Sequence, residues 1–533
     1  MTIEMTDTAE RALALAFQSG DRAHGVQLIG RCARSWLKAG EVAHVLRWTT
    51  QLSRAEILDN DAIATSHIAS MIFRRRFAEA KEWLRDAEQR LADSSAASAR
   101  LQTLRLMLAV LSQEAGDDVL LAEVGDGPCD RYLSGTLIAL QAYALLRKNR
   151  FDAAKRRALR AKELLGEHGD IYGASFAEVL VLFAQRLSGD LLASARTCER
   201  LYATLEQGPR NPAWVNAATA LAQLRYEQNR LEEARSLCVE LVPHLKFAST
   251  PESLATHYVT FARLELSAGH EQEALRLLEY LHSVMEDGRH SRLIALTVYE
   301  RVRASLAIGE MDAAMRIANE AGIDADGEAW THARAYDSGW ERLGQTHALL
   351  LRYANAFDRA RAVLQTLIKS AGHAGCIVRV IGLEATLADC EWQAGRRAQA
   401  FEAIERALLR SRAVGFTRAM FDEAPELGSI LRAVSSERRI AQLLPANFLE
   451  RYATLLPVDA RPAAVAAPIE PLTERERRVL QLVASGMRNE EISAQLRIAL
   501  STTKWHLKNV FAKLGVACRT EALVRARQMN LLS

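Results

Sequence analysis

Residues 485–516, SGMRNEEISAQLRIALSTTKWHLKNVFAKLGV, place two lysines and a tryptophan on a helix that also has an apolar side. The i, i+3, i+4, i+7 spacing of a buried helix face is present at Leu507, Val510, Phe511 and Leu514. The opposite stripe holds Ser501, Lys504, Trp505, Lys508 and Ala512. Lysines neutralise phosphate or donate hydrogen bonds to guanine, whereas a hydrophobic core needs neither of these lysines. This stripe therefore predicts a helix that enters the DNA major groove.

Two shorter helices are expected to position this one. The first opens with Thr473 and Glu476 in capping-box spacing and ends at Gly486. The second is expected to begin with Asn489 as its N-cap and to turn Ile492 and Leu496 inward. A short turn then leads to the lysine-bearing helix, so the last two helices form a helix-turn-helix. A fourth helix is expected over about 520–529.

The C-terminal segment resembles the LuxR-type DNA-binding domain in one unbroken register. The matching residues are Leu472, Thr473, Arg475, Glu476, Val479, Leu480, Ala484, Gly486, Asn489, Glu491, Ile492, Leu496, Thr502, Lys504, His506, Leu507, Asn509, Lys513, Leu514, Arg519 and Ala522. The resemblance implies major-groove contacts by Lys504, Trp505 and Lys508, and a fourth helix that can support dimers on DNA. It also places Asn489, Thr502 and His506 near the DNA backbone, although a structural role for His506 stays open. The residues expected at DNA are Thr473, Asn489, Ser501, Thr502, Lys504, Trp505, His506, Lys508 and Arg519.

The sequence departs from the family pattern at two positions. The family usually has a serine cap where Ala499 stands and a valine where Thr503 stands. Loss of the cap costs about 1 kcal/mol, unless Ser501 caps a helix that starts later.

The long body of the chain is a repeat. A small or turn residue, four others and then usually alanine precede an amphipathic pattern, as in NRFDAAKRRAL and GHEQEALRLL. The sixth position of this phrase falls at Ala154, Ser194, Ala234, Ala274, Ala314, Ala360 and Ala400, with an earlier copy at Ala80 and a degenerate one around GDDVLLAEVG. From Ala154 to Ala400 the intervals are 40 residues except for one of 46.

A period near 40 fits two antiparallel helices with two turns. The Gly or Asn suits a tight turn with φ > 0, and the Ala lets the second helix approach its partner. The expected fold is therefore all-α: an α-solenoid of ~40-residue helix pairs, followed by a small four-helix helix-turn-helix domain of LuxR type.

The front of the chain, SGDRAHGVQLIGRCARSWLKAGEVAHVLRWTTQL, resembles the opening of the helical-repeat domain of MalT-type regulators. Such regulators carry an upstream nucleotide-binding domain. No Gly-Lys dipeptide occurs here, so the chain has no G-x-x-x-x-G-K-[ST] phosphate loop. The chain is then either a fragment of a larger ATP-dependent activator or a member that lacks the ATPase domain.

Composition divides the chain further. Four of the eleven prolines lie within residues 457–471. The expected domains are therefore a tetratricopeptide-like sensor or interaction domain at 1–455, a Pro/Ala-rich linker at 456–471, and the DNA-binding domain at 472–533. Residues 472–533 hold eleven Lys/Arg against five Asp/Glu, whereas the remainder holds 57 against 60. Only the C-terminal segment is expected to meet a polyanion.

An irregular insert lies in the 46-residue interval and concentrates Trp330, Tyr336 and Trp340. These aromatics could line an effector pocket, or they could pack the interruption in the solenoid. Seven cysteines without C-x-x-C spacing indicate reduced thiols rather than a zinc site or a disulfide framework. No cofactor, metal or catalytic residue is expected.

These features predict a cytoplasmic bacterial transcription regulator that is not an enzyme. Its helical repeats would sense a small molecule or a protein and control the helix-turn-helix. Expected partners are double-stranded DNA, RNA polymerase and a second copy on DNA, with no membrane. The alternative is a protein-interaction scaffold tethered to DNA.

Overall fold

The computed structural model describes residues 3–74, 76–112, 131–208, 210–247, 250–323, 330, 332, 334–414, 418–434, 472–485, 487–514 and 522. Within these ranges every regular element is a helix, which confirms the all-α prediction. None of the described helices combines the length and apolar character that crossing a bilayer requires. The linker at 456–471, the degenerate repeat around 116–125 and all of 520–529 except Ala522 lie outside the described residues.

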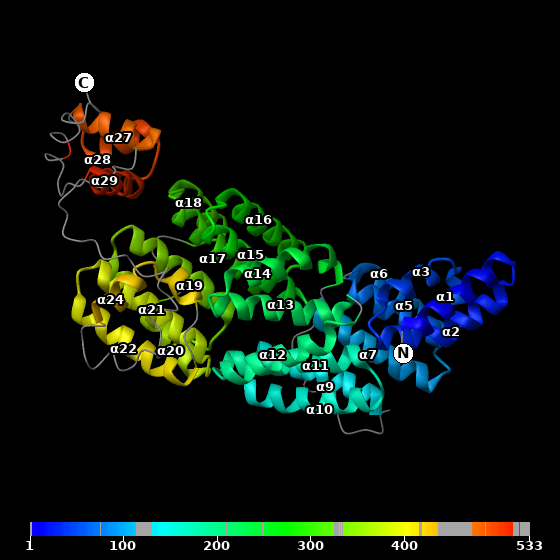
Figure 1. Ribbon diagram of the computed structural model, residues 1–533. Coiled ribbons are helices and arrows are strands. Elements are labelled where there is room, and N and C mark those ends of the chain that lie inside the picture. Colours follow the sequence, from blue (N-terminus) through cyan, green and yellow to red (C-terminus); the bar gives the residue numbers. More distant parts are fainter. Residues whose placement is uncertain are drawn as a thin grey trace. The chain divides into compact units, whose positions relative to one another are not determined.

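Contacts between Cα atoms divide the chain into two compact units (Figure 1). The first contains Met1–Ile294, Gly372–Arg379 and Arg410–Arg418. Its helices are α1 (Ile3–Gln18), α2 (Arg22–Lys38), α3 (Val42–Thr49), α4 (Arg54–Leu58), α5 (Asp61–Phe73), α6 (Phe77–Arg90), α7 (Ser95–Leu111), α9 (Arg131–Arg147), α10 (Phe151–Glu167), α11 (Ile171–Ser188), α12 (Leu191–Leu205), α13 (Pro212–Glu227), α14 (Leu231–Leu241), α15 (Pro251–Ser267) and α16 (Glu271–Asp287), with the 3-10 turn η1 (Val242–Phe247) after α14.

The second unit contains Ala295–Ala371, Val380–Leu409 and Ala419–Ser533. Its helices, some of which extend past these limits, are α17 (Ser291–Ala307), α18 (Met311–Glu320), α19 (Ser338–Tyr353), α20 (Phe357–His373), α21 (Ile377–Gln393), α22 (Arg397–Val414), α23 (Ala419–Glu423), α24 (Leu427–Val434), α27 (Glu474–Ala484), α28 (Asn489–Leu496) and α29 (Leu500–Leu514).

The turn inside each helix pair follows the repeat seen in the sequence. The second helix begins two residues after a residue with left-handed backbone, and the φ angles of these residues run from 59° to 98°. They are Asn149, Gly189, Asn229, Gly269, Gly309, Asn355 and Gly395. Glycine and asparagine tolerate this conformation, so they mark the sharp reversal between antiparallel helices.

The repeated small residue explains how closely the paired helices approach. It is the fourth residue of its helix in each copy, and all eight copies are buried. Ala80, Ala154, Ala234, Ala274, Ala314, Ala360 and Ala400 are 0% exposed, and Ser194 is 6% exposed. A larger side chain here would push the two helices apart.

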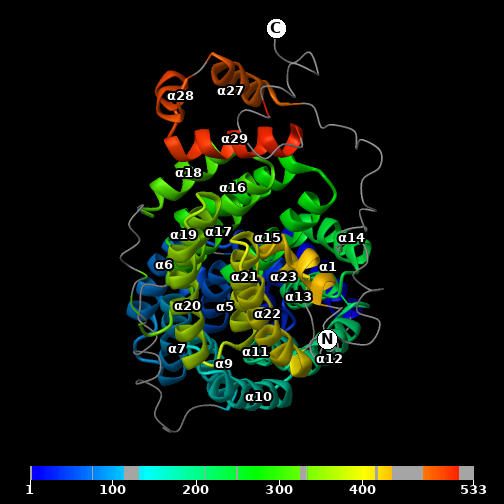
Figure 2. The ribbon, with the colours of Figure 1, turned by 90° about the vertical axis from the view of Figure 1, so that its left-hand side faces the viewer.

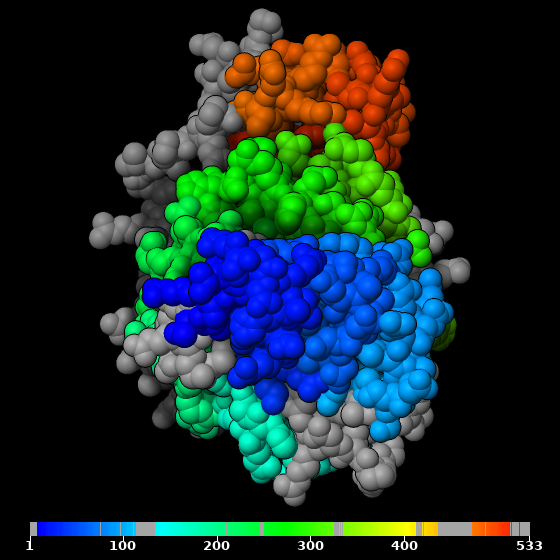
Figure 3. Space-filling view, turned by 90° about the vertical axis from the view of Figure 1, so that its right-hand side faces the viewer, coloured from blue at the N-terminus to red at the C-terminus, as the bar shows by residue number. Residues whose placement is uncertain are grey.

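The N-terminal helices form a compact start to the first unit. They present one continuous surface, blue in Figure 3. Beneath it, one apolar core contains Leu13, Ile29, Trp36, Val45 and Ile63. Burial of these large side chains supplies the main stabilisation of this end.

Helices α27, α28 and α29 lie together as a small group, visible in Figure 2. Their shared core consists of Val479, Leu482, Val483, Ile492 and Leu507. Met487, Leu496 and Phe511 pack against it from partly buried positions. This is the helix arrangement expected for residues 472–514.

Candidate nucleic-acid interface

The first helix of the C-terminal group starts as the sequence predicts. Thr473 is the N-cap of α27, where its side chain accepts a hydrogen bond from the Glu476 N–H at 3.2 Å. Glu476 Oε2 in turn accepts from the Thr473 N–H at 2.8 Å, which completes the capping box. Thr473 is itself exposed at the helix start.

Glu476 has a second role that the sequence did not reveal. Lys513 Nζ on α29 lies 2.8 Å from Glu476 Oε2, so this carboxylate ties α27 to α29. Burial alone would raise the pKa of Glu476, but the hydrogen bonds from Lys513 and Thr473 hold that pKa below its usual value.

The prediction that Asn489 caps α28 is wrong. Arg488 occupies the N-cap position, and its N–H donates to Glu491 Oε2 at 2.6 Å. Asn489 is the first residue of the helix. Because Glu491 satisfies the Arg488 N–H, this helix start needs no hydrogen-bond-accepting side chain at the cap, and α28 begins one residue earlier than an Asn489 cap would allow.

The turn between α28 and α29 is made by Arg497, whose φ of 53° is left-handed. Helix α29 then begins at Leu500, and the Ala499 carbonyl accepts from the N–H groups of Thr502 and Thr503. Ala499 therefore stands at the N-cap position without a side-chain oxygen. The alternative in which Ser501 caps a later start is wrong, because Ser501 lies inside the helix and is exposed.

The two faces of α29 differ as predicted. Leu507 and Val510 are buried, and Phe511 packs against the shared core. Ser501, Lys504 and Lys508 are exposed, and Trp505 is half-buried. Two lysines one turn apart on the side opposite the core form a basic stripe suited to a polyanion.

Three neighbouring positions on α29 are less accessible. Thr502, Thr503 and His506 are 2%, 0% and 7% exposed. Within the described part of the chain, Thr503 Oγ1 and His506 Nδ1 find no hydrogen-bond partner. Burial lowers the pKa of His506 below its usual value, so its neutral form is favoured. The structural role for His506 is thereby favoured over a backbone contact.

Arg519 and the side chains of Ala512 and Leu514 lie outside the described residues. Their expected roles, at DNA for Arg519 and in the helix faces for Ala512 and Leu514, stay predictions.

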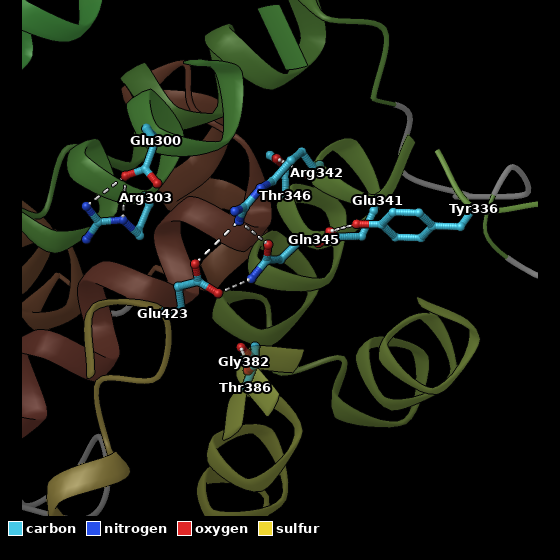
Figure 4. Close-up of polar contacts among 10 residues, drawn as sticks. All are labelled: Glu300, Arg303, Tyr336, Glu341, Arg342, Gln345, Thr346, Gly382, Thr386 and Glu423. Atoms are coloured by element: carbon cyan, nitrogen blue, oxygen red, sulfur yellow. Dashed lines mark hydrogen bonds and ion pairs between the residues drawn. The ribbon is translucent and has the colours of Figure 1, made fainter. Parts of the chain in front are cut away.

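The aromatic insert is engaged in internal contacts. Trp330 Nε1 donates to the Trp340 carbonyl at 3.1 Å, and the Trp330 ring stacks on His347 with 5.3 Å between centroids. Both tryptophans are buried. The Tyr336 hydroxyl reaches Glu341 Oε2 at 3.0 Å, as Figure 4 shows. These contacts favour the packing alternative, and an effector role for the three rings stays a prediction.

A buried polar network in the second unit was missed by the sequence analysis (Figure 4). Glu423 at the end of α23 accepts from Gln345 Nε2 at 3.0 Å and lies 3.4 Å from Arg342 Nη1, both on α19. Glu300 and Arg303 form a second ion pair on α17 at 3.0 Å. Glu423 and its partners on α19 are about 80 residues apart in the sequence and follow no local pattern. Their contact is therefore visible only in the three-dimensional structure.

Comparison with known proteins agrees with this geometry. The family described as the MalT-like TPR region matches residues 128–437, and the luxR family of bacterial regulatory proteins matches residues 470–526. The HTH-type transcriptional regulator MalT of Klebsiella pneumoniae (strain 342) is 22% identical over 512 residues, which cover 89% of this chain and 54% of that protein. MalT of Cronobacter sakazakii (strain ATCC BAA-894) is 24% identical over 393 residues, covering 69% of this chain and 42% of the relative. The chain thus spans about half the length of these relatives.

Among solved structures, a Rap protein complexed with competence and sporulation factor has a TM-score of 0.51 and 14% sequence identity. The match covers 67% of this chain and 99% of that chain. At this identity the likeness supports the helical-repeat fold alone.

Proposed function

The chain belongs to the MalT-like TPR family, and on this premise we propose that it is a sequence-specific DNA-binding transcription regulator. In this proposal α29 enters the major groove and the helical repeats control that contact. The proposed domains keep the bounds expected from the sequence: the repeats at 1–455, a linker at 456–471 and the DNA-binding domain at 472–533. RNA polymerase and a second copy on DNA are the proposed partners, in the cytoplasm.

The observation that carries the proposal is the basic stripe of α29. Lys504 and Lys508 are exposed on the side of the helix opposite the buried Leu507 and Val510. The core of α27, α28 and α29 fixes the orientation of this stripe. A helix held from behind with lysines facing outward can dock in a groove without disturbing its own core.

The repeats are proposed to sense a small molecule or a protein partner. Support comes from the fold, because superhelical repeats offer large inner surfaces, and from the Rap protein, whose solved structure is a complex with competence and sporulation factor. The alternative, a scaffold tethered to DNA, predicts no effector-dependent change in DNA affinity.

Replacement of Lys508 distinguishes recognition of a base from contact with the DNA phosphates. The duplex for this test is selected from a random pool by the full-length chain. If Lys508 donates to a guanine edge, Lys508→Ala should weaken binding by roughly 1–3 kcal/mol and relax discrimination at one base pair. If it only neutralises phosphate, binding should weaken evenly, and the salt slope should fall by about one. Titration at several salt concentrations, with the selected and a scrambled duplex, distinguishes the two.

Lys81→Ala, which removes an exposed lysine of α6, serves as the matched control and should leave both affinities unchanged. The free energy of unfolding should change by less than about 0.5 kcal/mol in either variant. Unchanged DNA affinity in Lys508→Ala would remove α29 as the recognition helix and with it the proposed function.

A further inference from the structure

Five helices of the first unit close into a ring. Contacts join α2 to α5, α5 to α7, α7 to α9 and α9 to α11, and α11 returns to α2. At the closure, Lys38 Nζ donates to the His168 carbonyl at 3.1 Å, and Asn211 Nδ2 donates to the Ala39 carbonyl at 2.9 Å. Phe73 on α5 meets Tyr172 on α11 edge to face, with 4.9 Å between centroids. Repeats that touch only their neighbours would not make these contacts, so the ring is a specific feature of this end.

A cavity of about 280 Å³ lies inside this ring. Its wall is mainly apolar, with Leu104, Met107, Leu111, Leu140 and Phe176 among the lining residues. The volume is near the lower end of the range for small-molecule sites. It admits a ligand of at least about ten heavy atoms.

The polar lining of the cavity has an excess of positive charge. Arg34, Lys38 and Arg100 line it together with the carboxylate of Asp170. Arg34 and Arg100 both donate to Asp61 Oδ2, the Arg34 bond being 2.8 Å long. With His168 left aside, the residues that the structure describes here place three cations against the two carboxylates of Asp170 and Asp61. Along α7 the lining changes from Arg100 through Thr103 to Met107 and Leu111. One charged region and one long apolar wall thus meet in a single cavity.

We propose that this cavity binds a small amphipathic carboxylate, with its apolar body along α7 and its carboxylate beside Lys38, Arg34 and Arg100. Arginine and lysine hold carboxylates by charge-assisted hydrogen bonds, which strengthen where water is displaced. The apolar wall supplies the remaining affinity.

The lining argues against two other ligand classes. A sugar needs many hydrogen-bond partners. The hydroxyls of Thr65 and Thr103 already donate to the Asp61 and Ala99 carbonyls of their own helices, and Leu104, Met107, Leu111, Leu140 and Phe176 offer a sugar no hydrogen-bond partner. An amphipathic cation would bring a like charge to the excess positive charge of the lining.

This inference rests on the proposed function, because the cavity would bind the effector of that regulator. Ligand binding itself is measured without DNA. Calorimetric titration of the full chain with octanoate, octanol and octylamine is the test. Octanoate should bind one to one and raise the melting temperature, octanol should bind at least about tenfold more weakly, and octylamine should not bind.

Variants locate the binding. Met107→Trp narrows the cavity beside its apolar wall and should weaken octanoate binding at least about tenfold, whereas Leu192→Trp adds the same ring at an exposed position of α12 and should preserve it. Lys38→Gln should weaken octanoate binding by about tenfold and leave the affinity for octanol unchanged. If Met107→Trp loses helicity, Thr103→Leu provides a smaller obstruction with the same expected direction.

Three results would overturn the proposal: hexanoate, octanoate and 4-phenylbutyrate all fail to bind, octanol binds as tightly as octanoate, or a folded Met107→Trp binds octanoate as tightly as the wild type. A separate DNA titration keeps the two proposals distinct. Loss of octanoate binding with intact DNA affinity contradicts the cavity alone.

Discussion

The stability of the first unit depends on two buried histidines remaining uncharged. His67 and His257 are 3% and 0% exposed. Burial is the main cause that lowers the pKa of each to about 4, from an ordinary value of 6.5. His67 Nδ1 lies 2.7 Å from Thr49 Oγ1, whereas neither ring nitrogen of His257 has a hydrogen-bond partner in the described part of the chain. Protonation of either ring would place an unpaired charge in an apolar setting.

This burial predicts a pH dependence of stability. Between pH 6.5 and about 4 the unfolded chain binds more protons than the folded chain at these two sites, so the free energy of unfolding falls as the pH falls through this window. Each histidine contributes a slope of up to about 1.4 kcal/mol per pH unit. Urea unfolding at several pH values should show a shallower slope in His257→Leu, and His24→Leu, at an exposed position, should retain the wild-type slope. Equal slopes in all three proteins would contradict the buried-histidine account.

Individual residues show where sequence analysis succeeds and where it fails. The turn residues, such as Asn149 and Gly189, and the buried Ala274 were predictable because each obeys a local conformational rule. The lysine stripe of α29 was predictable from helical spacing. The burial of Thr502 was not, because spacing assigns a residue to a face but does not show how far its neighbours cover that face.

At the scale of elements, α29 is a helix whose first turn lacks a cap. Ala499 supplies only its carbonyl at the N-cap position. Because a side-chain oxygen there would satisfy a free N–H of the first turn, Ala499→Ser should stabilise the helix by about 1 kcal/mol. Hydrogen exchange of α29 peptides in the full chain should slow by about fivefold.

The control for this prediction is Ala494→Ser, the same change at an exposed position in the interior of α28. This change should destabilise α28 slightly, because serine is a poorer helix former than alanine. Faster exchange in Ala499→Ser would mean that α29 does not begin at Leu500.

Long-range contacts between elements could not be predicted from the sequence. The bond from Asn211 to the Ala39 carbonyl joins residues 172 apart, and the bonds from α19 to Glu423 span about 80 residues. No repeat pattern specifies either, since each depends on how successive helix pairs turn. The ring around the cavity and the polar network are consequently findings of the structure, whereas the helix pairs themselves follow from periodicity.

At the scale of the whole molecule, the repeats predict that damage stays local. Helix pairs in a solenoid contact mainly their neighbours, so stability is close to a sum of adjacent terms. Ala274 is 0% exposed at the fourth position of α16, where that helix approaches α15. Ala274→Leu should therefore wedge this pair apart and cost roughly 1–3 kcal/mol locally.

Hydrogen exchange by mass spectrometry maps the extent of this damage. Peptides of α15 and α16 should exchange faster in Ala274→Leu, those of α13 and α17 to a smaller degree, and those of α1 to α5 and α27 to α29 at the wild-type rate. Gln272→Leu adds the same side chain at an exposed position of α16 and should leave all rates unchanged. Uniform acceleration across the chain would mean that the units unfold as one cooperative body. A wedge in the repeats would then also weaken DNA binding, whereas local damage leaves the affinity for the selected duplex intact.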